Sequence, residues 1–247
     1  MESKQSVADV WKLAPIVERY LGLRADLPLA QEQIGVMLAI LATRTESVSR
    51  FLDLGCGDGI LGAALLGSYP ESQGLLVDFS EPMLAQARER LYDFAGQLEF
   101  LNLDYADPAW VQAVQHAAPF DAIVSGYSIH HQPDERKKAI YAGIFDLLQL
   151  GGWFINIEHI APASKVAKNL FENHFIDALY ARDSQSGGVQ TREQVAEAFL
   201  SSPERAANIL APVDAQCDWL RGMGFEEVDC YCRIYELVVF AGRKPYS

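Results

Sequence analysis

The residues best suited to chemistry lie close together in one glycine-rich stretch, FLDLGCGDGILG, at positions 51–62. It holds four glycines and two aspartates directly after an apolar pair. Glycines allow positive φ angles and let a backbone approach a ligand closely. We therefore expect this stretch to form a cofactor-binding turn between a strand and a helix.

Two classes of cofactor use glycine turns of this kind. Residues 57–62 fit the G-x-G-x-x-G pattern of dinucleotide-binding proteins, and an acidic residue, Asp78, follows about twenty positions later. Asp53, however, precedes the first glycine by two residues, where its carboxylate would repel a pyrophosphate and attract an ammonium group. Gly55 also opens the turn earlier than that pattern requires. These features favour a cofactor with a cationic group, and an NAD-dependent oxidoreductase is the alternative.

The segments around this turn predict an α/β fold. Strand-like and helix-like segments alternate from residue 50 to residue 159, which predicts βαβ units and a mainly parallel sheet. The last two strand-like segments, FEEVDCYCRI and YELVVFAGRK, are too close for a crossover helix, so they should pair antiparallel. Further helices are expected over residues 5–21, 30–42, 164–182, 190–208 and 213–223, with the one over 190–208 interrupted by Pro203.

The motifs follow one another as they do in the class I S-adenosylmethionine-dependent methyltransferases of the small-molecule type, which this chain resembles over residues 51–243. FLDLGCGDG is similar to the first motif of that family, and Asp78 and Asp104 match the acidic residues after its second and third strands. FDAIVSGYSIHHQ and LLQLGGWFINIEH resemble the segments around its fourth and fifth strands. The resemblance implies a Rossmann-like, seven-stranded, mainly parallel sheet with a terminal antiparallel hairpin.

The resemblance also implies one methyltransferase domain over residues 1–247. Its cofactor-binding core would comprise residues 46–160 and 211–247. Helices in residues 1–45 and an insertion after the fifth strand, residues 161–210, would form a helical lid.

In that family the cofactor is S-adenosyl-L-methionine, and the product formed from it is S-adenosyl-L-homocysteine. Carried over by position, the backbone at Gly55, Cys56 and Gly57 would line the methionine part, with Asp53 near its amino group. Asp78 would accept hydrogen bonds from both ribose hydroxyls.

Four further residues would complete the cofactor site. Phe79 would pack on the adenine, and Asp104 or its neighbour Tyr105 would meet the adenine edge. Ser125 would border the sulfonium. Asp78 and Asp104 could instead serve only as helix caps or turn formers.

Methyl transfer from a sulfonium is an in-line displacement, so the protein mainly aligns the acceptor and excludes water. A base is needed only when the acceptor must lose a proton. The catalytic candidates end the fourth and fifth strands: His131, His130, Tyr127 and His159. A histidine can take a proton from a hydroxyl or an amine near neutral pH. Alternatively, the histidine pair only shapes the pocket or caps the following helix.

Candidate substrate contacts are Trp11 and Tyr20 in the first helix, Glu158 at the end of the fifth strand, and His174 in the insertion. Because neighbouring strand residues point to opposite faces, we expect only one of Glu158 and His159 to face the site. For Trp11, Tyr20 and His174, plain helix packing is the competing interpretation.

Composition excludes several other classes. A net charge of -13 disfavours a nucleic-acid partner, because phosphate binding needs clustered lysine and arginine. No apolar run approaches the roughly 18 residues of a membrane span, and the first residues lack the layout of a secretory signal, so we expect a cytoplasmic protein. The four cysteines show no C-x-x-C spacing, so no metal site is expected. Cys230 and Cys232 should share one face of a strand.

A small-molecule acceptor is expected, methylated on oxygen, nitrogen or carbon, and a homodimer is compatible with the sequence. The chain lacks the Asn- or Asp-Pro-Pro-aromatic run of DNA and glutamine methyltransferases and the Pro-Cys pair of cytosine carbon-5 methyltransferases. Two other interpretations stay open. One is an enzyme similar to the carboxy-S-adenosylmethionine synthase of the tRNA-wobble system, and the other is a non-catalytic cofactor-binding subunit.

Overall fold

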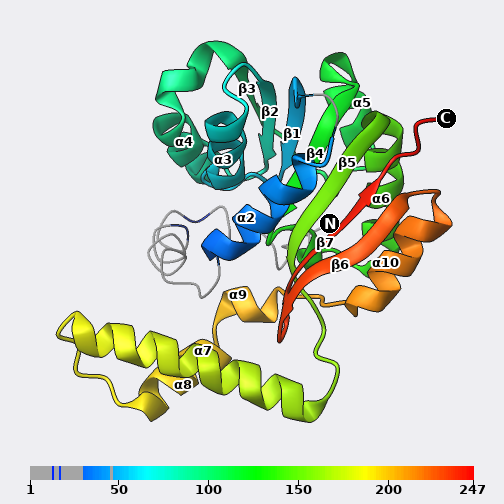
Figure 1. The fold of residues 1–247 in the computed structure, drawn as a ribbon. Coiled ribbons are helices and arrows are strands. Elements are labelled where there is room, and N and C mark those ends of the chain that lie inside the picture. The colour runs from blue at the N-terminus through cyan, green and yellow to red at the C-terminus, as the bar shows by residue number, and fades with distance from the viewer. Residues whose placement is uncertain (1–12, 14–16, 18–29, 45–46) are drawn as a thin grey trace, which may run out of the picture.

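The structure is a computed structural model that describes residues 13, 17, 30–44 and 47–247. Its centre is a seven-stranded sheet with the strand order β3-β2-β1-β4-β5-β7-β6 (Figure 1). The first five strands pair in parallel, whereas β7 runs antiparallel to β5 and β6. The expected Rossmann-like sheet with a terminal hairpin is confirmed. The strands are β1 (Arg50–Leu54), β2 (Gln73–Asp78), β3 (Leu98–Asn102), β4 (Phe120–Gly126), β5 (Leu148–His159), β6 (Glu226–Ile234) and β7 (Leu237–Arg243).

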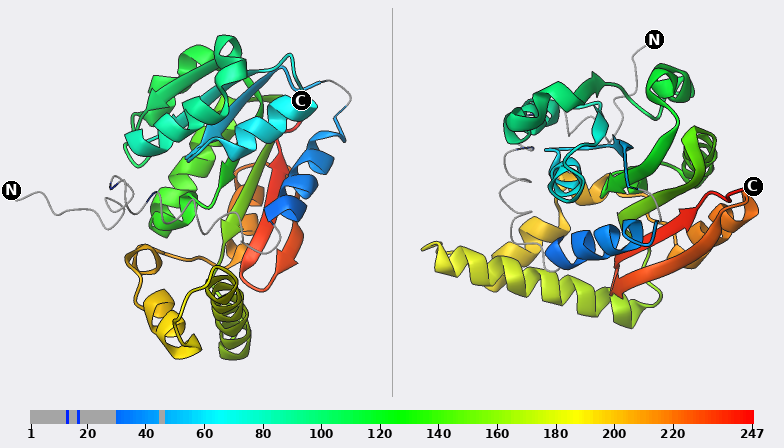
Figure 2. Two further views of the ribbon diagram at one scale, coloured as in Figure 1. Left: turned by 90° about the vertical axis from the view of Figure 1, so that its left-hand side faces the viewer. Right: turned by 45° about the horizontal axis from the view of Figure 1, so that its top comes forward.

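Helices cover both faces of this sheet (Figure 2). The α-helices are α2 (Ala30–Leu41), α3 (Ile60–Ser68), α4 (Glu81–Arg90), α5 (Trp110–Val114), α6 (Asp134–Leu147), α7 (Lys165–Gln185), α8 (Arg192–Leu200), α9 (Pro203–Ala206) and α10 (Val213–Gly222). Short 3-10 helices are η2 (Tyr92–Gln97), η3 (Gln115–Ala117) and η4 (Ile129–His131). One core joins the sheet to α5, α6 and α10, and the other joins it to α2, α3 and α4. Alternating side chains of β1 divide between them, with Leu52 and Leu54 in the first and Phe51 in the second.

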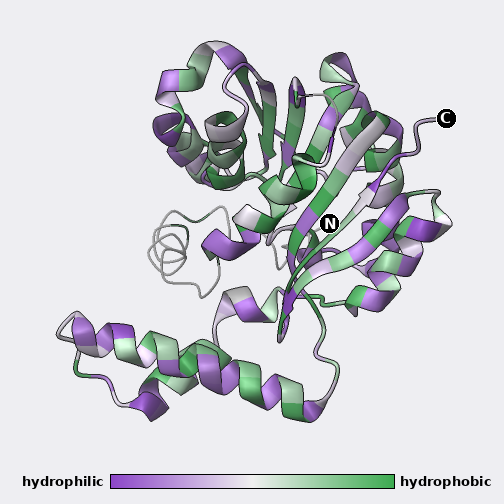
Figure 3. Ribbon diagram, in the orientation of Figure 1, coloured by the Kyte–Doolittle hydropathy of each residue, from purple (hydrophilic) through white to green (hydrophobic). Residues whose placement is uncertain are grey.

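Central strands of the sheet are more deeply buried than the edge strand β6. Nearly every residue of β4 and β7 is buried, as expected for strands covered on both faces. The edge strand β6 alternates between exposed and half-buried residues. Figure 3 shows hydrophobic residues concentrated in the central strands and mixed with polar ones along α7. Among the residues that the structure describes, none of the helices combines the length and apolarity of a membrane span.

The strand β6 contains a bulge that was not expected. Its register against β7 shifts between Cys230 and Cys232. Cys230 consequently packs with the α6 and α10 core, and Cys232 with the opposite one. The expectation that these cysteines share one face is wrong, because an extra residue in one strand reverses the alternation of side chains.

After β5 the chain leaves the sheet and forms α7 and α8, which pack on each other beyond the strand ends (Figure 1). Ser164 caps α7, and a capping box on Thr191 begins α8. The helix expected over residues 190–208, with an interruption at Pro203, is present as α8 and α9, and α9 begins at that proline. Proline lacks the amide hydrogen that would continue the preceding helix. Residues 207–211 then lead back to the core.

Candidate active site

The glycine turn lies where β1 ends, at the edge of the sheet that binds ligands in this class of fold. Gly55, Gly57 and Gly59 have φ angles of 71°, 54° and 76°, in the left-handed region that side chains disfavour. A Cβ on Gly55 would also overlap the Ser128 hydroxyl and lie 3.3 Å from Tyr105 Cε1. All three glycines therefore suit the backbone turn, and Gly55 is also required for close packing.

The backbone amides of the turn are directed into the protein. The amides of Gly55 and Cys56 both donate to the Val77 carbonyl, at 2.8 and 2.9 Å, and the Gly57 amide donates to Asp78 Oδ2 at 2.9 Å. Dinucleotide-binding turns present such amides to the pyrophosphate. Because these three already have protein acceptors, the turn does not suit a pyrophosphate, which weakens the NAD alternative. Any contact from these residues to a methionine part would use their Cα or carbonyl groups.

Asp78 ends β2 and holds the turn in place. It is 7 % exposed, and its Oδ1 accepts the Ser80 amide at 2.8 Å while Oδ2 accepts that of Gly57. Burial raises the pKa of this carboxyl to about 6, although the amides of Ser80 and Gly57 oppose that change. Each carboxylate oxygen can accept more than one hydrogen bond, so Asp78 retains the capacity to bind hydroxyl groups.

The charges around the turn fit a cofactor that carries positive groups. Asp53 is completely buried, and its Oδ2 accepts the Gly62 amide at 3.1 Å in the first turn of α3. Asp58 is paired with Arg90 through an Nη2–Oδ2 distance of 2.6 Å. Asp53 and Asp78 thus place carboxylates beside the turn, where they would attract an ammonium or sulfonium group and repel a phosphate. Part of the role of Asp53 is to stabilise the helix N-terminus.

Two of the expected cofactor contacts have other partners. Tyr105 is 3 % exposed, and its hydroxyl lies 2.6 Å from Ser128 Oγ, so its ring packs beneath the loop instead of forming an exposed edge for adenine. Ser125 is completely buried and donates to the Leu54 carbonyl at 2.7 Å, which fastens β4 to β1. Asp104 is exposed, and its Oδ1 accepts the Ala106 amide in a local turn. Phe79 is half-buried beside Asp78.

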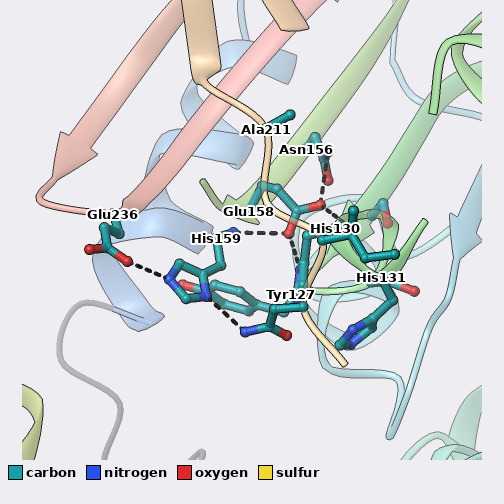
Figure 4. Close-up of polar contacts among 12 residues, drawn as sticks. Tyr127, His130, His131, Asn156, Glu158, His159, Ala211 and Glu236 are labelled. Atoms are coloured by element: carbon teal, nitrogen blue, oxygen red, sulfur yellow. Dashed lines mark hydrogen bonds and ion pairs between the residues drawn. The ribbon is translucent and has the colours of Figure 1, made fainter. Parts of the chain in front are cut away.

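Three histidines gather around Glu158 where β4 and β5 end (Figure 4). Glu158 is 1 % exposed and accepts four hydrogen bonds. Its Oε1 accepts His130 Nδ1 at 2.5 Å and the His159 amide at 2.9 Å. Its Oε2 accepts the His130 amide at 3.1 Å and Asn156 Nδ2 at 3.3 Å. His159 also belongs to this cluster, with its ring centre 5.9 Å from that of His130, and the expectation that only one of Glu158 and His159 faces the substrate stays a prediction.

Burial sets the protonation of this cluster. It raises the pKa of Glu158 to about 7 and lowers the pKa of His130 well below its ordinary value. Burial, together with the neighbouring His130, lowers the pKa of His131 to about 3. Both neighbouring imidazoles, whose ring centres are 4.0 Å apart, are therefore neutral near pH 7. A neutral imidazole can accept a proton.

The hydrogen-bond partners assign a tautomer to each ring, since carbonyl and carboxylate oxygens only accept. His131 Nδ1 lies 3.2 Å from the Ala207 carbonyl, so Nδ1 carries the hydrogen and Nε2 the lone pair. His130 has the same tautomer when its Nδ1 donates to ionised Glu158. His159 has the opposite one, because its Nε2 lies 2.9 Å from Glu236 Oε2.

Tyr127 lies between this cluster and α2. Its φ is 50°, a conformation that costs energy for a non-glycine residue and is often found at functional sites. Its hydroxyl donates to Oε1 of the buried Gln33 at 2.6 Å. A cavity of about 20 Å³ adjoins it and is mostly apolar. The cavity is lined by Ala30, Gln33, Ile34, Ile60, Leu61, Gly126, Tyr127 and Ile157.

Three substrate candidates remain. Trp11 and Tyr20 lie outside the described residues. His174 is exposed on α7, with its ring centre 6.0 Å from that of Tyr235 in the β6–β7 hairpin. Phe171, one turn earlier, reaches the cluster instead, with its ring centre 5.4 Å from that of His159.

Four residues of this region were missed at the sequence level: Gln33, Ser128, Asn208 and Glu236. Ser128 could have been found, because it lies within the histidine motif next to candidates already selected. The other three belong to no motif. They reach the site only through folding of distant segments.

Comparison with known proteins agrees with this geometry. Residues 51–152 match the family model described as a methyltransferase domain. The carboxy-S-adenosyl-L-methionine synthase of Nautilia profundicola is 22% identical over 90% of this chain and 88% of its own length. The ubiquinone/menaquinone biosynthesis C-methyltransferase of Desulfotalea psychrophila is 25% identical over 86% of this chain and 80% of its own length.

The fold is shared with solved methyltransferases. An O-methyltransferase family protein from Burkholderia thailandensis superposes with a TM-score of 0.66 at 16% identity and covers 99% of this chain. The present chain spans only 65% of the length of that structure. The matching family model identifies residues 51–152 as a methyltransferase domain, and with the glycine turn, the acidic residue ending β2 and the sheet order it supports a class I S-adenosylmethionine-dependent methyltransferase.

Proposed function

We propose that this protein transfers a methyl group from S-adenosyl-L-methionine to a small-molecule acceptor that gives up a proton. The observation that carries the proposal is the meeting of the glycine turn with the histidine cluster. Ser128, directly before η4, lies over Gly55, and His130 within η4 pairs with Glu158. Cofactor-binding and proton-accepting groups are thus built into one edge of the sheet.

Asp78 would hold the ribose hydroxyls of the cofactor, and Asp53 would attract its amino group. Phe79 and Asp104 would flank the adenine. When bound, the cofactor supplies a methyl group already activated by the positive sulfur. The chain itself then needs to align the acceptor, exclude water and receive any proton that is released.

The proton acceptor that the geometry supports best is His130 acting with Glu158. Ionised Glu158 accepts the hydrogen on His130 Nδ1, which leaves Nε2 as the basic nitrogen and stabilises the ring once it is protonated. The raised pKa of Glu158, about 7, lets the pair hold one additional proton near neutral pH. His131 is the second choice, because its Nδ1 faces a neutral backbone carbonyl at 3.2 Å, whereas His130 Nδ1 faces a carboxylate at 2.5 Å. Both ring nitrogens of His159 already face protein partners.

Residues 161–210 would act as the lid of the site. Phe171 on α7 packs near His159, and the return segment contacts all three histidines. The cavity beside Tyr127 is lined mainly by apolar side chains. These features favour an acceptor that is partly hydrophobic.

The first test is a calorimetric titration with S-adenosyl-L-homocysteine and, separately, with NADH. We expect micromolar binding of the first and no binding of the second. Transfer of an isotopically labelled methyl group would then be screened against hydroxyl-, amine- and carbon-acid-bearing small molecules. Binding of NADH alone, or cofactor binding without transfer to any acceptor class, would contradict the proposal.

A second candidate rests on the similarity to the carboxy-S-adenosyl-L-methionine synthase, which extends over 90% of this chain. In this case the protein would modify the cofactor itself. Mass spectrometry of the nucleoside that co-purifies with the protein separates the two functions. A carboxylated cofactor would favour the second candidate, and unmodified S-adenosyl-L-methionine the first.

A further inference from the structure

Three consecutive residues of the segment that returns from the insertion each contact one histidine of the cluster. The Ala207 carbonyl faces His131 Nδ1 at 3.2 Å. Asn208 Nδ2 faces His159 Nδ1 at 3.4 Å. The Ile209 amide donates to the His130 carbonyl at 2.9 Å. We call residues 207–209 the histidine clamp.

The clamp is anchored firmly on the core side. Nζ of Lys137, a fully buried residue of α6, donates to the Ile209 carbonyl at 2.5 Å. Two residues further on, the Ala161 amide donates to the Ala211 carbonyl at 3.0 Å. The clamp therefore joins the two ends of the insertion to the strand ends that carry the histidines.

Asn208 provides the one side chain of the clamp that bonds a histidine ring. His159 Nε2 carries a hydrogen because it faces the Glu236 carboxylate, so Nδ1 has a lone pair. The amide nitrogen of Asn208 only donates, which matches that lone pair. The next residue, Ile209, donates its amide to the His130 carbonyl, so two adjacent residues of the clamp contact the two carboxylate-paired histidines.

We infer that Asn208 is a positioning residue that holds the ring of His159 in the orientation set by Glu236 and, through its neighbour Ile209, couples the insertion to the His130–Glu158 pair. It does not touch the reacting atoms. Its amide donates to His159 only while the clamp is seated, so displacement of the insertion releases the His159 ring and the backbone of His130. The inference deepens the proposed methyl transfer, and it rests on that proposal for the role of His130 as proton acceptor.

The experiment is a ¹⁵N NMR measurement of imidazole tautomers in the full chain, with resonances assigned from single His→Gln variants. In the unsubstituted protein we expect hydrogen on Nε2 of His159 and on Nδ1 of His131. Asn208→Asp replaces the donor by a carboxylate that only accepts, so Nδ1 of His159 should gain a hydrogen. Asn208→Ala removes the contact, so the Nδ1 resonance of His159 should shift while Glu236 keeps the hydrogen on Nε2. Asn169→Ala, at an exposed position of α7, is the matched control.

A His159 ring with hydrogen on Nδ1 in the unsubstituted protein would overturn the inference. So would an unchanged ¹⁵N pattern in both Asn208 variants. If Asn208→Asp does not fold, Asn208→Ala alone decides between these outcomes. Calorimetry with S-adenosyl-L-homocysteine tests the proposed function separately. In each variant we expect a dissociation constant within about twofold of that of the unsubstituted protein. A failure of binding in the unsubstituted protein would remove the proposed function and leave the tautomer result standing.

Discussion

The carboxylate of Asp78, at the end of β2, accepts a hydrogen bond of 2.9 Å from the amide of Gly57 in the turn after β1. This contact ties the acidic residue and the glycine turn into one unit. Both were recognised separately in the sequence as parts of a cofactor site. Their direct bond means that a change at Asp78 alters the turn as well as the ribose contact.

Replacing Asp78 should therefore weaken cofactor binding strongly. Asp78→Ala removes the acceptor for two ribose hydroxyls and for the Gly57 amide, so we expect a loss of about 2–4 kcal/mol in binding free energy. Calorimetry with S-adenosyl-L-homocysteine measures it directly. Asp107→Asn is the matched control, because this exposed carboxylate only accepts the Ala109 amide. An affinity within twofold of the unsubstituted protein would exclude a ribose contact.

Cofactor affinity should also depend on pH through this carboxyl. The pKa of Asp78 lies at about 6, above its ordinary value, and the ionised form is the better acceptor for hydroxyls. Affinity should thus be constant above that pKa and fall by up to tenfold per pH unit below it. Titrations between about pH 5 and about pH 8, on both sides of this pKa, check the expectation. In Asp78→Asn the slope should disappear, and a persisting slope would assign it to another group.

Because Gly55 is closely packed, we predict that adding one methyl group at this position strongly lowers stability and cofactor binding. Gly55→Ala combines a strained positive φ, which costs about 1–2 kcal/mol, with overlap of the Ser128 hydroxyl. We expect a loss of stability in urea unfolding and a loss of cofactor binding. Gly67→Ala lies in α3 with open space around its Cβ and should be neutral or slightly stabilising. Equal behaviour of both variants would contradict the packing argument.

Glu158 should be essential for folding as well as for catalysis. Glu158→Ala leaves His130, His159 and Asn156 with buried donors that lose their acceptor, which should cost about 3–5 kcal/mol in the free energy of unfolding. Glu158→Gln keeps one acceptor oxygen and should cost less. Urea unfolding compares both with Glu197→Ala, an exposed change on α8.

The same pair of Glu158 variants separates structure from catalysis. In Glu158→Gln, S-adenosyl-L-homocysteine affinity should be retained, while methyl transfer to a proton-bearing acceptor falls by about 10²–10⁴-fold. Full activity in this variant would remove the His130–Glu158 pair from the reaction.

Much of the fold was predictable because its signals are local. The alternation of strand and helix segments identified the parallel sheet, and the short link between the last two strands required an antiparallel hairpin. Pro203 marked the break that divides one expected helix into α8 and α9. The β6 bulge near Cys230 had no local signal, since one inserted residue leaves the hydropathy pattern almost unchanged.

By itself, the sequence determined the glycine turn, the acidic residue that ends β2 and the family they identify, because these features depend on residues near one another in the chain. Only the tertiary structure decided which groups the histidines meet. His130 and Glu158 are 28 positions apart, His159 and Asn208 are 49 apart, and His159 and Glu236 are 77 apart. Burial of these contacts, not residue type, sets their protonation and tautomers, since desolvation and fixed partners exist only in the folded chain.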